Sequence, residues 1–121
     1  AILVVDIREG IKPQTAEVIS ILKANKTPFV IGLNKIDTLS GWQRYSSLKE
    51  SIESQAIHVK ERFDTLLLTF VGSLQSHGFD SDLYFNIDDF TKKIAIVPCS
   101  ARTEEGISEL ILMTLEFVVI V

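Results

Sequence analysis

Two short polar segments each follow directly after an apolar run, and they carry the side chains of this chain best suited to bind a ligand. Residues 34–37 read Asn-Lys-Ile-Asp and follow the run Phe29–Leu33. Residues 100–102 read Ser-Ala-Arg and follow a run that ends at Val97. Together they offer a carboxylate, an amide, a hydroxyl and two cations, a set that can match the hydrogen-bond donors and acceptors of a ligand. Either short polar segment alone is weak evidence of a binding site. The two together, each placed directly after an apolar run, are stronger evidence.

No comparable set exists for nucleophilic or metal chemistry. Cys99 precedes the second polar segment, but the histidines, His58 and His77, fall in a helical pattern that we expect to lie away from the strand ends. A cysteine at a strand end more often packs than reacts. The acidic segment 80–89 lacks the pattern of a calcium-binding loop. We therefore predict no catalytic residue and no metal ligand in this chain.

Hydrophobic patterning predicts the elements that position the two polar segments. The apolar runs predict three strands, each buried on both faces: Ala1–Ile7, Phe29–Leu33 and Lys93–Val97. A helix is predicted from Pro13, which suits a first helical turn, to about Asn25, and another from about Ile107 onward.

The long stretch between the second and third strands carries a second helical pattern. From Leu48 to His77 apolar residues recur every three or four positions, which predicts one long amphipathic helix with Gly78 as its C-cap. Thr38–Ser47 is expected to be a loop, and Phe79–Phe90 an irregular acidic segment.

This order of elements, βαβαβα, predicts an α/β fold of the doubly wound type. The sheet should be three-stranded and parallel, with right-handed crossovers and the strands in sequence order. Ligands in such folds bind at the carboxyl ends of the strands, so both polar segments are expected at one edge of the sheet.

The two polar segments resemble the base-reading motifs of translational GTPases. Further similarity lies in Ala1–Gly10, Pro13–Thr15, Thr27–Val30 and Gly41-Trp42, and it narrows the resemblance to translation initiation factor 2 of the archaeal and eukaryotic type, also called factor 5B. The resemblance covers essentially the whole chain. It implies half of a P-loop GTPase domain, from a cytoplasmic GTP hydrolase that acts with the ribosome in subunit joining and initiator tRNA placement.

The resemblance also implies how a guanine base is read. Asp37 would accept hydrogen bonds from N1–H and the N2 amine, which adenine does not offer as a pair. The stem of Lys35 would lie along the base, Asn34 would bridge the base and a neighbouring loop, and Ser100 would orient Asp37. The Ala101 backbone N–H would donate to O6. The expected nucleotide-binding residues are Asn34, Lys35, Asp37, Ser100, Ala101 and Arg102.

One half of the family's pattern is missing from these residues. The sequence contains neither Gly-x-x-x-x-Gly-Lys-Ser/Thr nor Asp-x-x-Gly, which in the family hold the phosphates, Mg²⁺ and the switch. We therefore expect residues 1–121 to be a single partial domain that reads the base of GTP or GDP. The Mg²⁺ ligands would belong to the parent protein, and the chain alone would be inactive in hydrolysis.

Composition limits the broader class. The chain has 121 residues, 46% of them hydrophobic, and a net charge of −4, which excludes a disordered chain and gives no bulk basic field for DNA or a membrane surface. No apolar run reaches the roughly 18–20 residues of a membrane span. The single cysteine suits a reduced, cytoplasmic setting. The apolar ends, Ala1–Val5 and Phe117–Val121, suggest a piece of a larger protein.

Two alternatives remain open at this point. A non-catalytic regulatory domain of the receiver type would need a carboxylate cluster at its strand ends, for which Asp6 and Asp37 are candidates without an accompanying acidic pair. Another translational GTPase, such as an elongation factor, is the second alternative. The expected Leu48–His77 helix argues against it.

Overall fold

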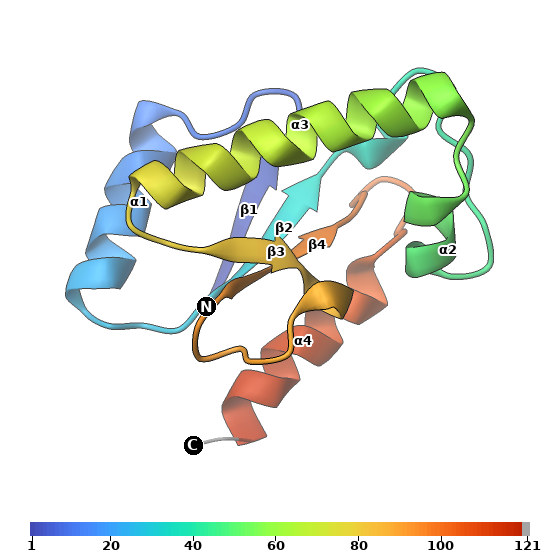
Figure 1. Cartoon of the computed structure of the whole chain (residues 1–121). Coiled ribbons are helices and arrows are strands. Elements are labelled where there is room, and N and C mark those ends of the chain that lie inside the picture. Colours follow the sequence, from blue (N-terminus) through green and yellow to red (C-terminus); the bar gives the residue numbers. More distant parts are fainter. Residues whose placement is uncertain (120–121) are drawn as a thin grey trace.

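A single parallel sheet organises the chain in the computed structural model, which describes residues 1–119 (Figure 1). The described sheet has four strands in the order β1-β2-β4-β3, and every pairing is parallel. The strands are β1 (Ile2–Asp6), β2 (Val30–Asn34), β3 (Ser81–Leu83) and β4 (Ile94–Pro98). The predicted α/β class, the parallel sheet and the relative order of the three long strands are confirmed.

Helices cover both faces of the sheet, which explains the apolar runs of the central strands. The prediction that the first run is also buried on both faces is wrong, because β1 lies at the edge of the described sheet and its Ile2 and Val4 side chains are exposed. In Figure 1, α3 (Ile57–Ser76) crosses one face and α4 (Ile107–Val119) lies against the opposite face. α1 (Pro13–Ala24) begins at the expected proline and lies on the α3 side, where Lys23 Nζ donates to the His77 carbonyl at 3.4 Å. The central strands β2 and β4 are consequently buried almost throughout.

The prediction of one long helix from Leu48 to His77 is wrong. The chain forms a short helix, α2 (Leu48–Glu53), then breaks at residues 54–56 before α3 begins. Gln55 explains the break: its buried amide donates to the Ser51 carbonyl at 2.7 Å and accepts the Gln43 N–H at 2.8 Å. A side chain thus satisfies a backbone group that a continuing helix would have satisfied. The apolar periodicity runs on through this break and so does not reveal it.

The segment Phe79–Phe90, expected to be irregular, contains β3 and a single 3₁₀ turn, η2 (Tyr84–Asn86). β3 pairs with the first half of β4, in the register Ser81 to Ile94 and Leu83 to Ile96. A strand of three residues with a central aspartate is too short for an alternation of apolar and polar residues to be recognised in the sequence. The sheet therefore has one more strand than the sequence predicted.

Two helices end in the same backbone motif. At the end of α3, the N–H of Phe79 donates to the Leu74 carbonyl, and Gly78 has φ +89°, which confirms the predicted glycine C-cap. At the end of α1, the N–H of Thr27 donates to the Leu22 carbonyl, but here Lys26 takes the left-handed position, at φ +52°. A side chain with a Cβ is strained there.

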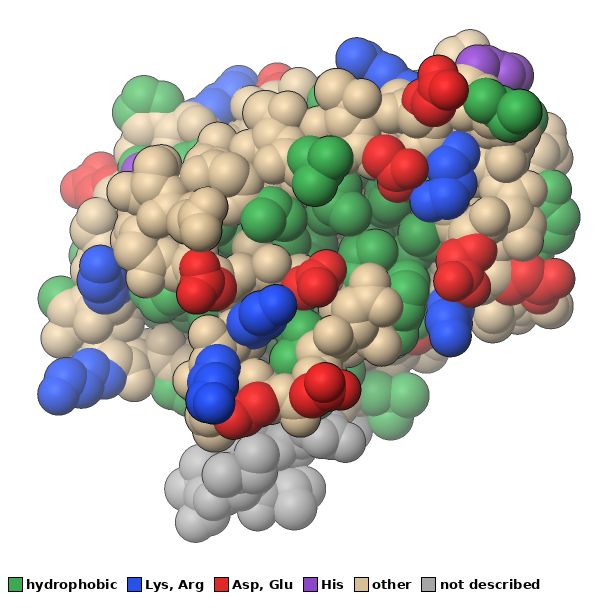
Figure 2. All heavy atoms as spheres, in the orientation of Figure 1, with side chains coloured by type: hydrophobic (Ala, Val, Ile, Leu, Met, Phe, Trp, Pro, Cys, Tyr) green, Lys and Arg blue, Asp and Glu red, His purple; other side chains and the backbone are tan. Residues whose placement is uncertain are grey.

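The surface in Figure 2 shows hydrophobic side chains gathered below α3, with acidic and basic side chains interspersed around them. No single charge sign dominates this face. Among the described residues, no helix is both long enough and apolar enough to cross a membrane. Ile120 and Val121, the last residues of the apolar closing segment, lie outside the described residues.

Candidate functional site

The end of β2 and the end of β4 are joined through their backbones. After Asn34, Lys35 takes a left-handed conformation with φ +71°, and the chain turns into the 3₁₀ helix η1 (Ile36–Thr38). Ile36 is fully buried and its N–H donates to the Cys99 carbonyl at 3.2 Å, while the Cys99 N–H donates to the Leu33 carbonyl at 2.9 Å. The two polar segments therefore meet at one edge of the sheet, as parallel neighbouring strands require.

Side chains complete this junction. Ser100 is fully buried, and its hydroxyl donates to Asp37 Oδ1 at 2.8 Å and accepts the Thr103 N–H at 3.1 Å. Asn34 Oδ1 accepts the backbone N–H of Ala101 at 3.0 Å. The Asp37 carboxylate is half-buried and fixed on one oxygen by a neutral donor. The remaining acceptor capacity of its two oxygens is available to a ligand.

Lys35 is held from the first strand. Its ammonium lies 3.2 Å from Asp6 Oδ2, and the other Asp6 oxygen accepts the Arg8 N–H at 2.9 Å. Burial would raise the pKa of Asp6, but the hydrogen bonds from Arg8 and Lys35 together lower it below its ordinary value of 3.8. Asp6 therefore carries a negative charge that keeps the strained lysine oriented along the strand ends. Asp6 was a candidate acid of the receiver-type alternative, and its pairing with Lys35 was not predicted.

These groups surround a shallow depression of about 290 Å³, which brings all six predicted nucleotide-binding residues together. Its lining also includes Arg8 and Thr38, which were not among the six predicted nucleotide-binding residues. Arg8 follows the end of β1, so its position after a strand was the available signal. The depression is lined by Arg8, Asn34, Lys35, Asp37, Thr38, Ser100, Ala101 and Arg102.

Two details bear on the expected base-reading arrangement. Asn34 Oδ1 accepts the Ala101 N–H, which is the contact with a neighbouring loop expected of Asn34, whereas the bond from this N–H to a guanine O6 stays a prediction. His58, expected to lie away from the strand ends, lines an adjacent depression with Arg8 and Thr38, because the start of α3 returns over this edge. The second detail corrects the prediction for His58.

Cys99 lies at this edge but is buried beneath it. Burial raises the pKa of the Cys99 thiol to about 11, so the thiol is neutral near pH 7. A neutral, buried thiol is a poor nucleophile, which confirms the interpretation that Cys99 is a packing residue.

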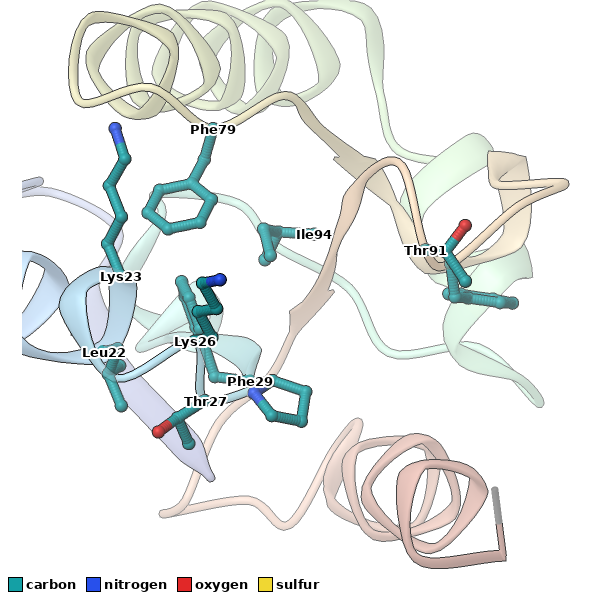
Figure 3. Close-up of a pocket in the computed structure, with 10 residues that line it drawn as sticks. Leu22, Lys23, Lys26, Thr27, Phe29, Phe79, Thr91 and Ile94 are labelled. Atoms are coloured by element: carbon teal, nitrogen blue, oxygen red, sulfur yellow. The ribbon is translucent and has the colours of Figure 1, made fainter. Parts of the chain in front are cut away.

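A larger cavity, of about 490 Å³, lies at the opposite, amino-terminal end of the strands. Phe29 immediately precedes β2 and Ile94 begins β4, and both line this cavity with Phe79. Figure 3 shows the Phe79 ring and the Lys23 side chain beside each other, with Lys23 Nζ 5.8 Å from the ring centroid. The lining is mostly apolar and offers few groups that could form hydrogen bonds with a ligand.

Comparison with known proteins assigns the family. Residues 1–119 match the family model described as elongation factor Tu GTP binding domain. A probable translation initiation factor IF-2 from Methanocella arvoryzae is 50% identical over 115 residues, covering 93% of this chain and 19% of that protein. Its counterpart from Sulfurisphaera tokodaii is 48% identical over 114 residues, covering 92% of this chain and 19% of that protein.

A solved structure agrees. The crystal structure of GDP-bound aIF5B from Aeropyrum pernix has a TM-score of 0.88 and 44% identity, covering 98% of this chain and 20% of that one. The chain thus spans about one fifth of the length of these relatives. These likenesses do not favour the receiver-type alternative. The chain belongs to the family of the elongation factor Tu GTP-binding domain, with similarity throughout to initiation factors of the IF-2 and aIF5B type.

Proposed function

We propose that this chain reads the guanine base in the nucleotide site of a translation initiation factor. The observation that carries the proposal is the pairing of the two strand ends, in which Ser100 holds Asp37 at 2.8 Å and Asn34 holds Ala101 at 3.0 Å. Family membership supports a guanine nucleotide as the ligand, as does similarity to a protein crystallised with GDP.

The proposed selectivity follows from the groups at this edge. Guanine presents N1–H and the N2 amine side by side, and the Asp37 carboxylate accepts both while Ser100 fixes its rotation. Adenine lacks this donor pair, so its binding would leave a partly desolvated carboxylate without partners. The stem of Lys35 lies along the base, with Asp6 3.2 Å from its ammonium holding the lysine in place.

Ala101 and Asn34 supply a second determinant. The Ala101 N–H now donates to Asn34 Oδ1. When guanine binds, this N–H would donate to O6, either in addition to Asn34 or in place of it. If the bond to Asn34 is replaced, the Asn34 side chain becomes available to contact the base edge. Adenine carries an amine at the same place, and a donor facing a donor is unfavourable. Arg102 would contribute positive charge near the bound nucleotide.

The rest of the parent protein would supply the chemistry. GTP hydrolysis depends on a phosphate loop, Mg²⁺ and a positioned water, and the residues of this sequence contain no motif for the first two. We propose that the parent is a GTP hydrolase acting with the ribosome and initiator tRNA in the cytoplasm. Residues 1–121 would then be its base-reading partial domain, inactive in hydrolysis alone.

Nucleotide binding to the full-length protein tests this proposal. We expect GDP to bind at least about 100-fold more tightly than ADP. Asp37→Ala should lower the affinity for GDP by about two decades. The substitution removes two hydrogen bonds to a charged group, of about 1.5–3 kcal/mol each, and water that fills the gap offsets part of this loss. Asp64→Ala is the control, because that carboxylate lies on α3 and pairs with Lys60. Equal affinities for GDP and ADP in the wild type would contradict the proposal.

A further inference from the structure

The loop after η1 reaches across to the loop after β4 at two points outside the base-reading groups. The Trp42 indole Nε1–H donates to Glu105 Oε1 at 2.9 Å. Two residues later, Arg44 Nη1 donates to the Thr103 carbonyl at 2.7 Å. We call this pair of contacts the Trp42 clasp. It ties the segment that follows Asp37 to the segment that follows Ser100.

Glu105 transmits this contact to the base-reading residues. Its carbonyl accepts the Ser100 N–H at 2.8 Å, so the loop 100–105 closes on itself. Within the loop, the Thr103 N–H donates to the same Ser100 hydroxyl that holds Asp37. Three hydrogen bonds, joined through the covalent structure of Glu105 and Ser100, therefore connect the Trp42 indole to the Asp37 carboxylate.

The clasp is anchored on a rigid base. The Trp42 ring lies 5.7 Å from the Phe63 ring of α3, and Phe63 is fully buried. Gly106, which follows Glu105 at φ +79°, is packed so closely that a Cβ there would lie 2.3 Å from the Pro98 carbonyl oxygen. Both ends of the clasp thus rest on core elements, which limits how far the loop 100–105 can shift.

Glu105 is an unusual choice for a purely structural contact. The residue is only 4% exposed, and its second carboxylate oxygen is buried without a hydrogen-bond partner among the described residues. A buried acceptor left unpaired destabilises a fold, and an apolar residue at this place would avoid that penalty. A buried, unpaired acceptor beside the proposed base site is a departure from optimal packing of the kind that functional sites carry.

We propose that Trp42 is a positioning residue for guanine selectivity: through Glu105 it fixes the Ser100–Ala101 segment and thereby the orientation of Asp37. This inference rests on the proposed function. Losing the clasp would leave the base site assembled but loosely aligned. The contact that depends most on alignment is the one between the second Asp37 oxygen and the guanine N2 amine, because both of its partners must be correctly directed.

The test compares GDP with inosine diphosphate, which lacks the N2 amine, in the full-length protein. In Trp42→Phe the ring remains over Phe63 but the N–H donor is lost, and we expect the preference for GDP over inosine diphosphate to fall about threefold to tenfold. Glu105→Gln keeps an acceptor for the indole and should retain most of the preference, whereas Glu105→Ala should lose it.

A matched control separates positioning from stability. Phe70→Leu changes a buried side chain of α3 two turns beyond Phe63 without removing a hydrogen bond, and it should lower the melting temperature while leaving the GDP preference intact. If Trp42→Phe leaves the preference as unchanged as Phe70→Leu does, or if the two variants lower it equally, the positioning role is overturned while the proposed function stands. If the wild type shows no preference for GDP over ADP, the proposed function itself fails first.

Discussion

The two ends of strand β2 carry cavities of opposite character. At the amino-terminal end, Phe29 and Ile94 line an apolar space of about 490 Å³. At the carboxyl end, a smaller depression of about 290 Å³ is lined almost entirely by polar side chains. The difference teaches that the cavity we propose for the nucleotide is distinguished by its polar lining and not by its size. Selectivity for a base needs directed donors and acceptors, and of these two cavities it is the one at the carboxyl end of β2 and β4 that brings such groups together.

Each end also holds a lysine in the left-handed conformation, and the two lysines have different reasons to be there. Lys26, at φ +52°, occupies the position that glycine occupies after α3. Lys35, at φ +71°, pairs with Asp6 and lines the candidate site. The backbone strain at Lys35 accompanies contacts that glycine would not make, whereas at Lys26 glycine would serve equally well.

The largest effect we expect comes from the apolar end. Phe29 is 1% exposed and packs edge-to-face on Phe79 at 5.3 Å. Phe29→Ala should lower the free energy of unfolding of the chain by about 3–5 kcal/mol, measured by urea denaturation. Phe29→Leu keeps a large apolar side chain and should cost less.

The same substitution tests whether the two ends are independent. In full-length protein that remains folded, Phe29→Leu should leave the ratio of GDP to ADP affinity unchanged. A changed ratio would mean that the apolar end takes part in base selection, and the contrast between the ends would be lost.

A smaller effect is expected at the two left-handed lysines. Lys26→Gly relieves about 1–2 kcal/mol of backbone strain and adds about 0.4–1 kcal/mol of unfolded-state entropy, so we expect a net stabilisation of about 0.5–1 kcal/mol. Its effect on GDP binding should be nil. Lys35→Gly relieves similar strain but should lower the affinity for GDP about threefold to tenfold, or by about 0.6–1.4 kcal/mol, because the proposed contact between the lysine's alkyl stem and the base is lost. Equal GDP affinities in the two variants would contradict the distinction between the lysines.

The smallest effect concerns Asp6 and depends on pH. The folded-state pKa of Asp6 lies below 3.8, so its carboxylate stabilises the fold above that pH and loses this contribution as the pH falls through the folded-state value. The difference in free energy of unfolding between the wild type and Asp6→Asn should therefore be constant from about pH 5 to 7 and shrink toward about pH 3. Denaturant titrations at these pH values measure it. A difference that grows on acidification would show that the ion pair with Lys35 does not stabilise the fold.

The sequence predicted those features that depend on local patterns and on the geometry of parallel sheets. The bounds of β2 and β4 were expected to within one residue because continuous apolar runs mark doubly buried strands. The contact between Ser100 and Asp37 was implied by the family resemblance, and sheet geometry explains it, because both residues follow neighbouring strands.

Features that depend on single side chains were not predictable in this way. Gln55 breaks a helix inside an unbroken apolar periodicity, and only its amide contacts show why. The pairing of Lys35 with Asp6 and of Trp42 with Glu105 joins residues far apart in the chain. Such pairs leave no local periodicity, so they become visible only when the strands and loops are placed in space.

The central claim is that Asp37 reads the guanine base, and the substitution Asp37→Asn tests it most directly. The change replaces one acceptor oxygen with an amide donor, which faces the guanine N2 amine unfavourably but matches the carbonyl of xanthine at that position. In competition binding to the full-length protein, we predict that Asp37→Asn prefers xanthosine diphosphate over GDP, reversing the wild-type order. If the folded variant keeps the wild-type preference for GDP, or loses affinity for both nucleotides equally, Asp37 does not read the base.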